Sequence, residues 1–432
     1  MGTGRMGLVG SLLGGLLPAC SPAATPGGGP VWPGFRGPDR SGVSAEADWS
    51  TAWPSGEPKA LWRAALGTGS SGVAVGRGLV FSMGSVRGQD TVYALHGDTG
   101  AVAWTHAYPC ELFPSNHEGG PAATPALDGR RLFTLGRGGQ LFCFEASTGR
   151  VLWSRDLVKE FAATLPVYGL TGSPLVLGNR LIVTASGRGA STVAFDTSTG
   201  DVVWKAGDEE ASYASPVPFP EGKQTDVLVF NALALVRFDA ATGAERGRHP
   251  WVALAPNKAY VNAPTPVVSG DTVFITTGYN QGGARLRFPA GSGAPETLWK
   301  AKHPCAHYSG PVLFQGHLYG FDVDNEAHGK GKLTCVELET GAEKWARADL
   351  GWGNVSVAGG RLLALTREGE LAVAEATPAE YRELARAQVI AGPCRTEPTV
   401  FRGRLYVRNA KGELVCFDVS GGGVSAPGPQ SR

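Results

Sequence analysis

Short apolar segments separated by tight turns recur along most of the chain. In one clear copy, Val193 and Phe195 alternate with smaller residues, as in a strand packed on one side. Asp196 and Gly200 suit the turn that follows, because an aspartate side chain accepts backbone hydrogen bonds and glycine adopts a positive φ without strain. Trp204 then ends the unit with a large apolar surface. This pattern predicts a hairpin that ends in a buried tryptophan.

Tryptophans recur at intervals of 42 to 51 residues, at Trp62, Trp104, Trp153, Trp204, Trp251, Trp299 and Trp345. That interval, with strand-like segments between, is typical of a four-stranded propeller blade. Third strands of such units fall near Val92, Leu141, Val193, Leu235, Leu286, Leu333, Leu371 and Leu414. The last unit lacks a fourth strand, whereas residues 60–64 have no strands before them. We therefore predict an all-β, eight-bladed β-propeller of four-stranded antiparallel blades over residues 59–420, with the ring closed by an N-terminal strand.

One segment conflicts with this repeat. Residues 378–387 contain the run Glu-Leu-Ala-Arg-Ala, which reads as helical by its apolar spacing. Its position in the repeat predicts instead a fourth strand, with Leu384 in the place that tryptophan occupies in other units.

The N-terminus has the features of an export signal. In residues 1–20, Arg5 precedes a short, glycine-broken apolar run that is too short to span a bilayer. Leu-Pro-Ala-Cys then resembles a bacterial lipobox, which would leave Cys20 as the lipidated first residue. Simple secretion, or an incorrect start of the sequence, is the alternative. We expect an exported protein of the periplasm or the outer membrane, attached to the membrane only through its N-terminal lipid.

Two segments flank the predicted propeller. Residues 21–58 are rich in proline and glycine and are expected to form a tether, within which residues 32–38 bind the folded body as a strap. Residues 421–432 are expected to form a flexible tail.

The charged residues nearly cancel, with 39 lysines and arginines against 38 aspartates and glutamates. This balance argues against a nucleic-acid partner, and we expect none. The 63 glycines and 30 prolines occur among regular apolar runs, which indicates many turns rather than disorder. We expect a monomer.

The repeated Asp-x-x-x-Gly-x-x-x-Trp units resemble the tryptophan-docking repeats of PQQ-type eight-bladed β-propellers. This family includes quinoprotein dehydrogenases and outer-membrane assembly lipoproteins of the BamB type. Residues 35–43 and 319–321 also resemble a bacterial branch of PQQ-binding-like propeller proteins. The resemblance implies that tryptophans wedge between neighbouring blades, a role expected for Trp62, Trp104, Trp153, Trp204, Trp299 and Trp345.

A working quinoprotein needs a calcium site of carboxylate and amide oxygens, a catalytic carboxylate and, often in this family, a vicinal disulfide. The sequence has no Cys-Cys pair. Asp322 to Glu326 loosely resembles a calcium loop, but we interpret it as a solvated hairpin tip rather than a calcium site. We therefore predict no catalytic residues and no cofactor, with PQQ and calcium retained as the alternative.

The cysteines form two groups. Cys143, Cys335 and Cys416 occupy equivalent third-strand positions and are expected to be small buried side chains. The other group follows prolines in connections between blades, where a disulfide between two of its members stays open: Cys110, Cys305 and Cys394.

His303, Cys305 and His307 form the sharpest local cluster of metal-binding residue types. In an extended segment these alternate side chains would point the same way. Because no fourth ligand is evident, we predict no metal site and interpret the three as packed or hydrogen-bonded loop residues.

A set of polar and aromatic residues recurs just before the first strand of successive blades. Connections after fourth strands reach the face that usually bears the central funnel, so these residues are expected to form a crescent around its mouth. The alternative is that each tyrosine caps a strand and packs on its neighbour. The candidates are His117, Glu118, Tyr168, Tyr213, Tyr260, Asn262, His307, Tyr308 and Arg395.

These observations favour an exported, lipid-anchored, non-catalytic propeller that binds or scaffolds proteins of the cell envelope. One alternative is a PQQ-dependent quinoprotein oxidoreductase. Another is a binder of a small molecule or glycan in the propeller funnel.

Overall fold

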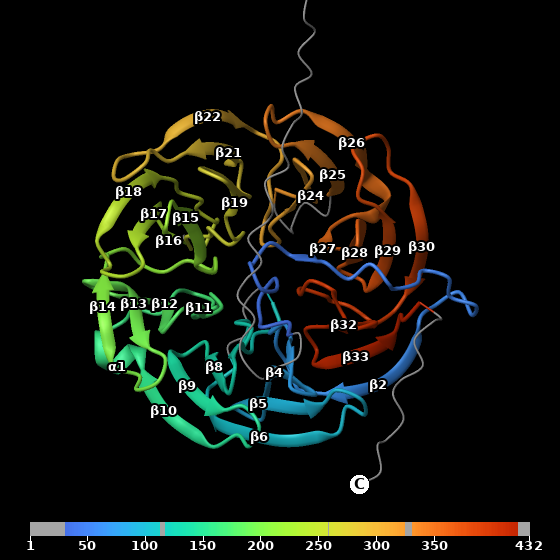
Figure 1. Cartoon of the computed structure of the whole chain (residues 1–432), viewed down its shortest axis with the longest axis horizontal. Coiled ribbons are helices and arrows are strands. Elements are labelled where there is room, and N and C mark those ends of the chain that lie inside the picture. The colour runs from blue at the N-terminus through green and yellow to red at the C-terminus, as the bar shows by residue number, and fades with distance from the viewer. Residues whose placement is uncertain (1–30, 113–116, 258, 325–330, 422–432) are drawn as a thin grey trace, which may run out of the picture.

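The computed structural model describes residues 31–112, 117–257, 259–324 and 331–421. The predicted signal peptide over residues 1–20, including Cys20, lies outside them, as do most of the predicted tail and the last two residues of Asp322 to Glu326. The described strands form eight sheets arranged as blades around a central axis (Figure 1). The predicted eight-bladed β-propeller is confirmed.

Blades 1 to 4 follow one another in sequence, each running from the axis to the rim. Blade 1 contains β3 (Ala74–Gly76), β4 (Leu79–Val86), β5 (Gln89–His96) and β6 (Val102–Pro109). Blade 2 contains β7 (Ala126–Asp128), β8 (Arg131–Leu135), β9 (Gln140–Glu145) and β10 (Val151–Asp156). Blade 3 contains β11 (Leu175–Leu177), β12 (Arg180–Gly187), β13 (Ala190–Asp196) and β14 (Val202–Ala206). Blade 4 contains β15 (Val217–Glu221), β16 (Gln224–Phe230), β17 (Ala234–Asp239) and β18 (Glu245–Pro250).

Blades 5 to 8 complete the ring. Blade 5 contains β19 (Val267–Ser269), β20 (Thr272–Thr277), β21 (Gly282–Arg287) and β22 (Glu296–Ala301). Blade 6 contains β23 (Val312–Phe314), β24 (His317–Asp322), β25 (Lys332–Glu337) and β26 (Glu343–Arg347). Blade 7 contains β27 (Gly353–Ala358), β28 (Arg361–Thr366), β29 (Glu370–Glu375) and β30 (Glu383–Gln388). Blade 8 contains β31 (Thr399–Phe401), β32 (Arg404–Arg408) and β33 (Glu413–Asp418).

The ring is closed by the N-terminal strand β2 (Lys59–Ala65), which pairs antiparallel with β33 as the outer strand of blade 8. A second short strand, β1 (Val43–Ser44), adds in parallel to the inner edge of β27. Two short helices, α1 (Leu157–Phe161) and η2 (Ala348–Leu350), lie in connections between blades. Within the described residues no helix is long and apolar enough to cross a membrane.

The repeated turn and tryptophan form the contact between neighbouring blades. The ring of Trp153 packs on Gly200 of the next blade so closely that a Cβ on this glycine would lie 2.6 Å from the ring. Gly200 also has φ of 74°, so two constraints select glycine there. The same arrangement recurs around the ring, with each indole nitrogen donating to a backbone carbonyl of the next blade for Trp62, Trp104, Trp153, Trp204, Trp299 and Trp345.

Blade 7 shows that the prediction for Leu384 is wrong by one residue. Each fourth strand carries a β-bulge just before the docking position, as between Val202 and Trp204 in blade 3. In β30 the bulged residue is Leu384, and Ala385 takes the register position of the tryptophans. Leu384 is therefore directed outward and is 37% exposed. The predicted strand itself is confirmed.

Blade 4 departs from the pattern because its docking position holds Gly247, opposite Arg237. Trp251, which continues the regular spacing, lies beyond the strand and donates to Thr277 Oγ1 at 2.9 Å. At the docking position itself, Arg237 reaches blade 5 and donates to the Pro289 carbonyl at 2.9 Å. A buried cation thus replaces an indole at this junction.

Apolar side chains fill the layers between blades, so the core is divided around the ring. Phe133 of blade 2 and Phe195 of blade 3, for example, belong to one cluster and are fully buried. Polar groups and the N-terminal segment lie around the central axis, and this segment crosses the middle of the ring in Figure 1. Trp32 fixes the start of this strap through paired backbone hydrogen bonds with Val75 of blade 1.

Candidate functional site

A central funnel with a volume of about 780 Å³ opens on the face where fourth strands connect to the next blade. Its wall comes from the ends of those connections. Phe35 and Arg36 of the strap also line the funnel. A proline directly precedes the first strand of several blades, as at Pro125, Pro174, Pro216 and Pro266.

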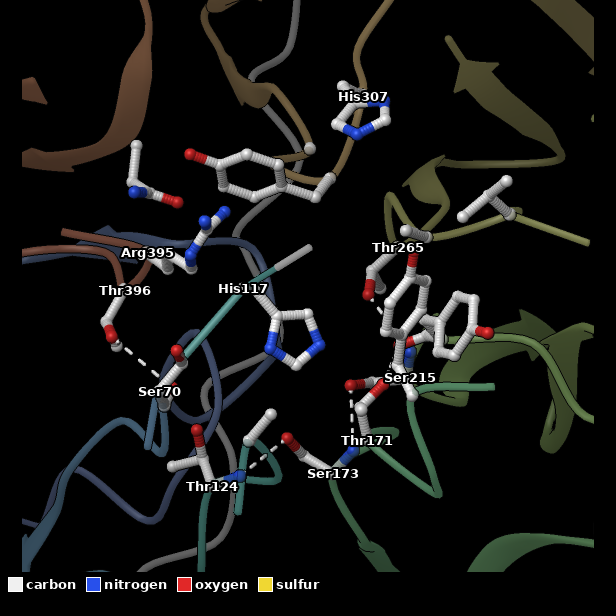
Figure 2. Close-up of a pocket in the computed structure, with 18 of the residues that line it drawn as sticks. Ser70, His117, Thr124, Thr171, Ser173, Ser215, Thr265, His307, Arg395 and Thr396 are labelled. Atoms are coloured by element: carbon white, nitrogen blue, oxygen red, sulfur yellow. Dashed lines mark hydrogen bonds between the residues drawn. The ribbon is translucent and has the colours of Figure 1, made fainter. Parts of the chain in front are cut away.

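A partial ring of hydroxyl groups, which we call the hydroxyl ring, lines the funnel in blades 2 to 5 at the positions directly before those prolines. Backbone N–H groups donate from blade to blade: Thr124 N to Ser173 Oγ at 2.9 Å, Ser173 N to Ser215 Oγ at 2.9 Å, and Ser215 N to Thr265 Oγ1 at 3.1 Å. Figure 2 shows these side chains following one another along the wall. Since each hydroxyl uses its oxygen as an acceptor, its own O–H can donate to a ligand in the funnel.

The ring of hydroxyls is interrupted where the strap enters. Gly310 takes the equivalent position in blade 6, and a Cβ there would lie 3.3 Å from Arg36 Nη1.

The Arg36 guanidinium donates to the Pro311 carbonyl at 2.6 Å and faces the charge of Glu397. Burial lowers the pKa of Arg36 and raises that of Glu397, and the attraction between the two opposes both shifts. The strap is further held by Arg40, which donates to the Pro216 carbonyl at 2.9 Å.

An aromatic belt lies above the hydroxyl ring, which we define as His117, Tyr168, Tyr213, Tyr279, His307 and Tyr308. Ring centroids lie 4.8 Å apart for His117 and Tyr168, and 5.4 Å apart for Tyr168 and Tyr213. On the far side the separations are 5.1 Å for Tyr279 and His307, and 5.9 Å for His307 and Tyr308. Tyr213 and Tyr279 pack on the same small apolar cluster, which joins the two arcs.

An ion pair between Arg395 and Glu118 lies beside the belt. Arg395 Nε lies 3.0 Å from Glu118 Oε2, and the guanidinium carbon lies 5.6 Å from the centre of the Tyr308 ring. Burial alone would raise the pKa of Glu118. A hydrogen bond from its own backbone N–H and the positive charge and hydrogen bond of Arg395 outweigh burial, so the pKa is lowered. His117 Nδ1 accepts from the Gly119 N–H at 2.7 Å, so a neutral His117 carries its proton on Nε2. Both arginines of the funnel thus have a carboxylate partner, and the belt is aromatic and close to neutral.

The structure brings together most of the residues predicted for a binding face. His117, His307 and Arg395 point into the funnel (Figure 2), where Tyr168, Tyr213 and Tyr308 also line the wall. Glu118 lies behind them as the partner of Arg395.

Two predicted residues lie elsewhere. Asn262 is completely buried and donates to the Asn231 carbonyl at 2.8 Å and the Trp251 carbonyl at 3.0 Å, so it holds a loop together. Tyr260 forms an isolated bridge with Leu254 outside the lining. The prediction for Asn262 is corrected because the residue's position in the repeat gives no information on its side chain's direction.

Tyr279 was not predicted because it belongs to the β20–β21 turn, whereas the prediction followed only the connections after fourth strands. It has φ of 56°, a left-handed conformation that is unusual for a bulky residue. Its N–H donates to the Asp324 carbonyl at 3.0 Å, which holds the turn over the funnel. The hydroxyl residues before the first-strand prolines were also not among the predicted residues, although their repeated position is visible in the sequence.

The funnel does not offer the donor set of a quinoprotein calcium site. Ca²⁺ takes about six to eight oxygen ligands, several of them carboxylates. Among the described residues that line the funnel, Glu397 is the one carboxylate, and it faces Arg36. These residues do not fit the ion, so no catalytic step is derived through it.

The described cysteines all carry free thiols, so none of the disulfides left open for Cys110, Cys305 and Cys394 is present. Cys143, Cys335 and Cys416 are buried opposite Trp153, Trp345 and Trp62 in the register of their blades. His307, which was considered as a third ligand beside His303 and Cys305, lines the funnel instead, and Asp322 lies beside the other two.

The model of one protein family, described as outer membrane protein assembly factor BamB, matches residues 111–347. BamB from Moraxella catarrhalis is 17% identical, with a TM-score of 0.60 over 84% of this chain and 100% of that one. The quinohemoprotein alcohol dehydrogenase from Comamonas testosteroni is 14% identical, with a TM-score of 0.64 over 93% of this chain and 82% of that one. No curated protein matches the sequence. At these identities the solved structures establish the fold alone.

Proposed function

The chain belongs to the family of the outer membrane protein assembly factor BamB, and from this premise we propose that it is an exported, non-catalytic binding protein of the cell envelope. The proposal includes lipid attachment through Cys20 and partners among envelope proteins. It rests chiefly on one observation, a central funnel whose aromatic belt is neutral and lacks clustered carboxylates.

The belt has the composition of a recognition surface. Tyrosine, histidine and arginine supply large contact areas with few torsions to fix, and each retains a polar group for hydrogen bonds. Burial raises the pKa of Tyr213, so its phenol stays protonated at neutral pH and can donate. With both arginines paired, long-range attraction of a polyanion is weak. The belt therefore suits a neutral, amphipathic segment, such as a loop of an envelope protein.

Site-specific photocrosslinking in cells tests this proposal. A photoreactive phenylalanine analogue at Tyr168 is expected to yield a discrete product with an envelope protein. The matched control is the same analogue at Lys223, in the β15–β16 turn on the opposite face. Adding Tyr213→Ala and Tyr308→Ala should suppress the Tyr168 product, because losing an interface aromatic costs about 2 kcal/mol, or roughly thirtyfold in affinity.

Identical products from Tyr168 and Lys223, or a Tyr168 product that survives both alanine substitutions, would contradict recognition at the belt.

The size of the funnel favours a second candidate, a neutral small molecule or glycan. Its volume of about 780 Å³ lies within the range of about 300–1,000 Å³ that is usual for such ligands. Tyr168 would then yield no protein product, while Tyr213→Ala and Tyr308→Ala would weaken binding of the small ligand.

A further inference from the structure

A second cluster of chemically reactive side chains lies outside the funnel, between blades 5 and 6. It consists of His303 and Cys305, from the connection after β22, and Asp322, the last residue of β24. Their ligating atoms all lie within 4.8 Å of one another. Sequence spacing could not reveal this group, because Asp322 is 17 positions from Cys305 and joins it only through the fold.

The carboxylate of Asp322 is held in a fixed orientation. Its Oδ1 accepts from the Cys305 N–H at 2.8 Å, and its Oδ2 lies 2.9 Å from His303 Nδ1. The Asp322 side chain is 3% exposed and Cys305 is buried, whereas the His303 side chain is 57% exposed. The cluster is thus fixed on its inner side and open to solvent at the imidazole.

We propose that His303 Nδ1, Cys305 Sγ and Asp322 Oδ2 bind a borderline transition-metal ion of the Zn²⁺ class, with a fourth position open to solvent. Imidazole, thiolate and carboxylate are the three ligand types that such ions take in proteins. Metal–ligand bonds of about 2.0–2.3 Å in a tetrahedron place ligand atoms roughly 3.3–3.8 Å apart. A pair of ligand atoms at the upper limit of 4.8 Å must therefore approach by about 1.0–1.5 Å, and the exposed His303 gives the cluster one ligand that is free to move.

The charges and protons of the site balance on binding. An ordinary cysteine thiol is protonated at neutral pH, and it binds a metal ion as the thiolate. A divalent ion displaces that one proton, and the imidazole binds neutral with its proton on Nε2. The charge of +2 is then matched by one thiolate and one carboxylate. The Lys332 ammonium, 3.9 Å from Asp322 Oδ2, is already paired with Glu343 at 2.6 Å and can turn toward it.

The sequence offers a matched control for this site. Cys394 also follows a proline in a connection after a fourth strand and is likewise buried. Among the described residues it belongs to no group of three metal-ligating side chains. A substitution at Cys394 therefore removes a buried thiol of the same kind without touching the proposed ligands.

Titration of the full chain with Co²⁺ tests the proposal, because cobalt reports thiolate coordination through near-ultraviolet charge-transfer absorption. We expect saturable absorption at one equivalent, reversed by Zn²⁺. Cys305→Ser should abolish the charge-transfer band, and His303→Ala should weaken binding at least tenfold while the exposed position leaves folding intact. Cys394→Ser should titrate as the unsubstituted chain does.

Absence of a saturable band in the unsubstituted chain would overturn the assignment. So would a band of undiminished intensity in a folded Cys305→Ser variant, or equal affinity in the His303→Ala variant.

Discussion

Replacing Trp204 by alanine is expected to lower the free energy of unfolding by about 3–5 kcal/mol, because it empties a blade junction that cannot collapse. Trp204 is 7% exposed, and its ring packs against Gly243 of blade 4, where a Cβ would lie 2.7 Å away. Its indole N–H donates to the Ala240 carbonyl at 3.0 Å. The substitution removes both the apolar contact and this hydrogen bond. Chemical denaturation followed by circular dichroism measures the effect.

The matched control is Val203→Ala on the same strand. Val203 is the bulged residue beside Trp204 and is 43% exposed, so its truncation should change the free energy of unfolding by about 0.5 kcal/mol or less. Equal effects of the two substitutions would mean that tryptophan docking does not stabilise the blade junction.

Replacing Arg237 by methionine is the second change with a large expected effect, again about 3–5 kcal/mol of unfolding free energy. The guanidinium is completely buried and donates to Asp226 Oδ2 at 2.6 Å and Glu221 Oε2 at 2.7 Å. Burial already raises the pKa of Asp226 against the opposing attraction of Arg237. Removing the guanidinium therefore leaves the buried Asp226 carboxylate without the positive charge that binds its Oδ2. It also removes the hydrogen bond to the Pro289 carbonyl of blade 5.

A double variant distinguishes this cause from simple loss of packing. Asp226→Leu combined with Arg237→Met should recover part of the lost stability, because no buried carboxylate then remains in need of Arg237. Arg246→Met is the control, since Arg246 lies 3.2 Å from the other Asp226 oxygen but is 22% exposed and should cost less. A double variant less stable than Arg237→Met alone would show that the ion pair is not the source of the effect.

The architecture was predictable because the turn and the tryptophan that form the main contact between blades belong to one short sequence motif. Each copy of the turn and tryptophan carries its own register, and the glycine that receives the indole is part of the same motif in the next blade. Even the helical-looking segment in blade 7 was assigned correctly as a strand from its position in the repeat. The error at Leu384 came from the preceding turn: Trp204 lies eight residues after Asp196, the end of β13, whereas Ala385 lies ten residues after Glu375, the end of β29, and no glycine marks the register there.

The candidate site was predictable only in part. Its wall follows the repeat, so Tyr168, Tyr213 and Tyr308 could be found from their common position. Tyr279 enters from another part of a blade, and Arg36 comes from a segment that reaches the axis only in the folded chain. The exchange of a tryptophan for Arg237 was equally hidden, because the cation and its carbonyl acceptor are 52 residues apart. These contacts form between segments that are far apart in the sequence and meet only in the folded ring.

A titration with PQQ and Ca²⁺ tests most directly whether this propeller is a binding protein or a quinoprotein. Absorption of the quinone would be followed on adding the full chain, with alcohols and sugars then supplied as electron donors. The neutral belt and the single, paired carboxylate of the funnel predict no saturable spectral shift and no substrate oxidation. Saturable binding with a shifted spectrum, followed by oxidation of an alcohol or sugar, would contradict the non-catalytic function proposed for the funnel.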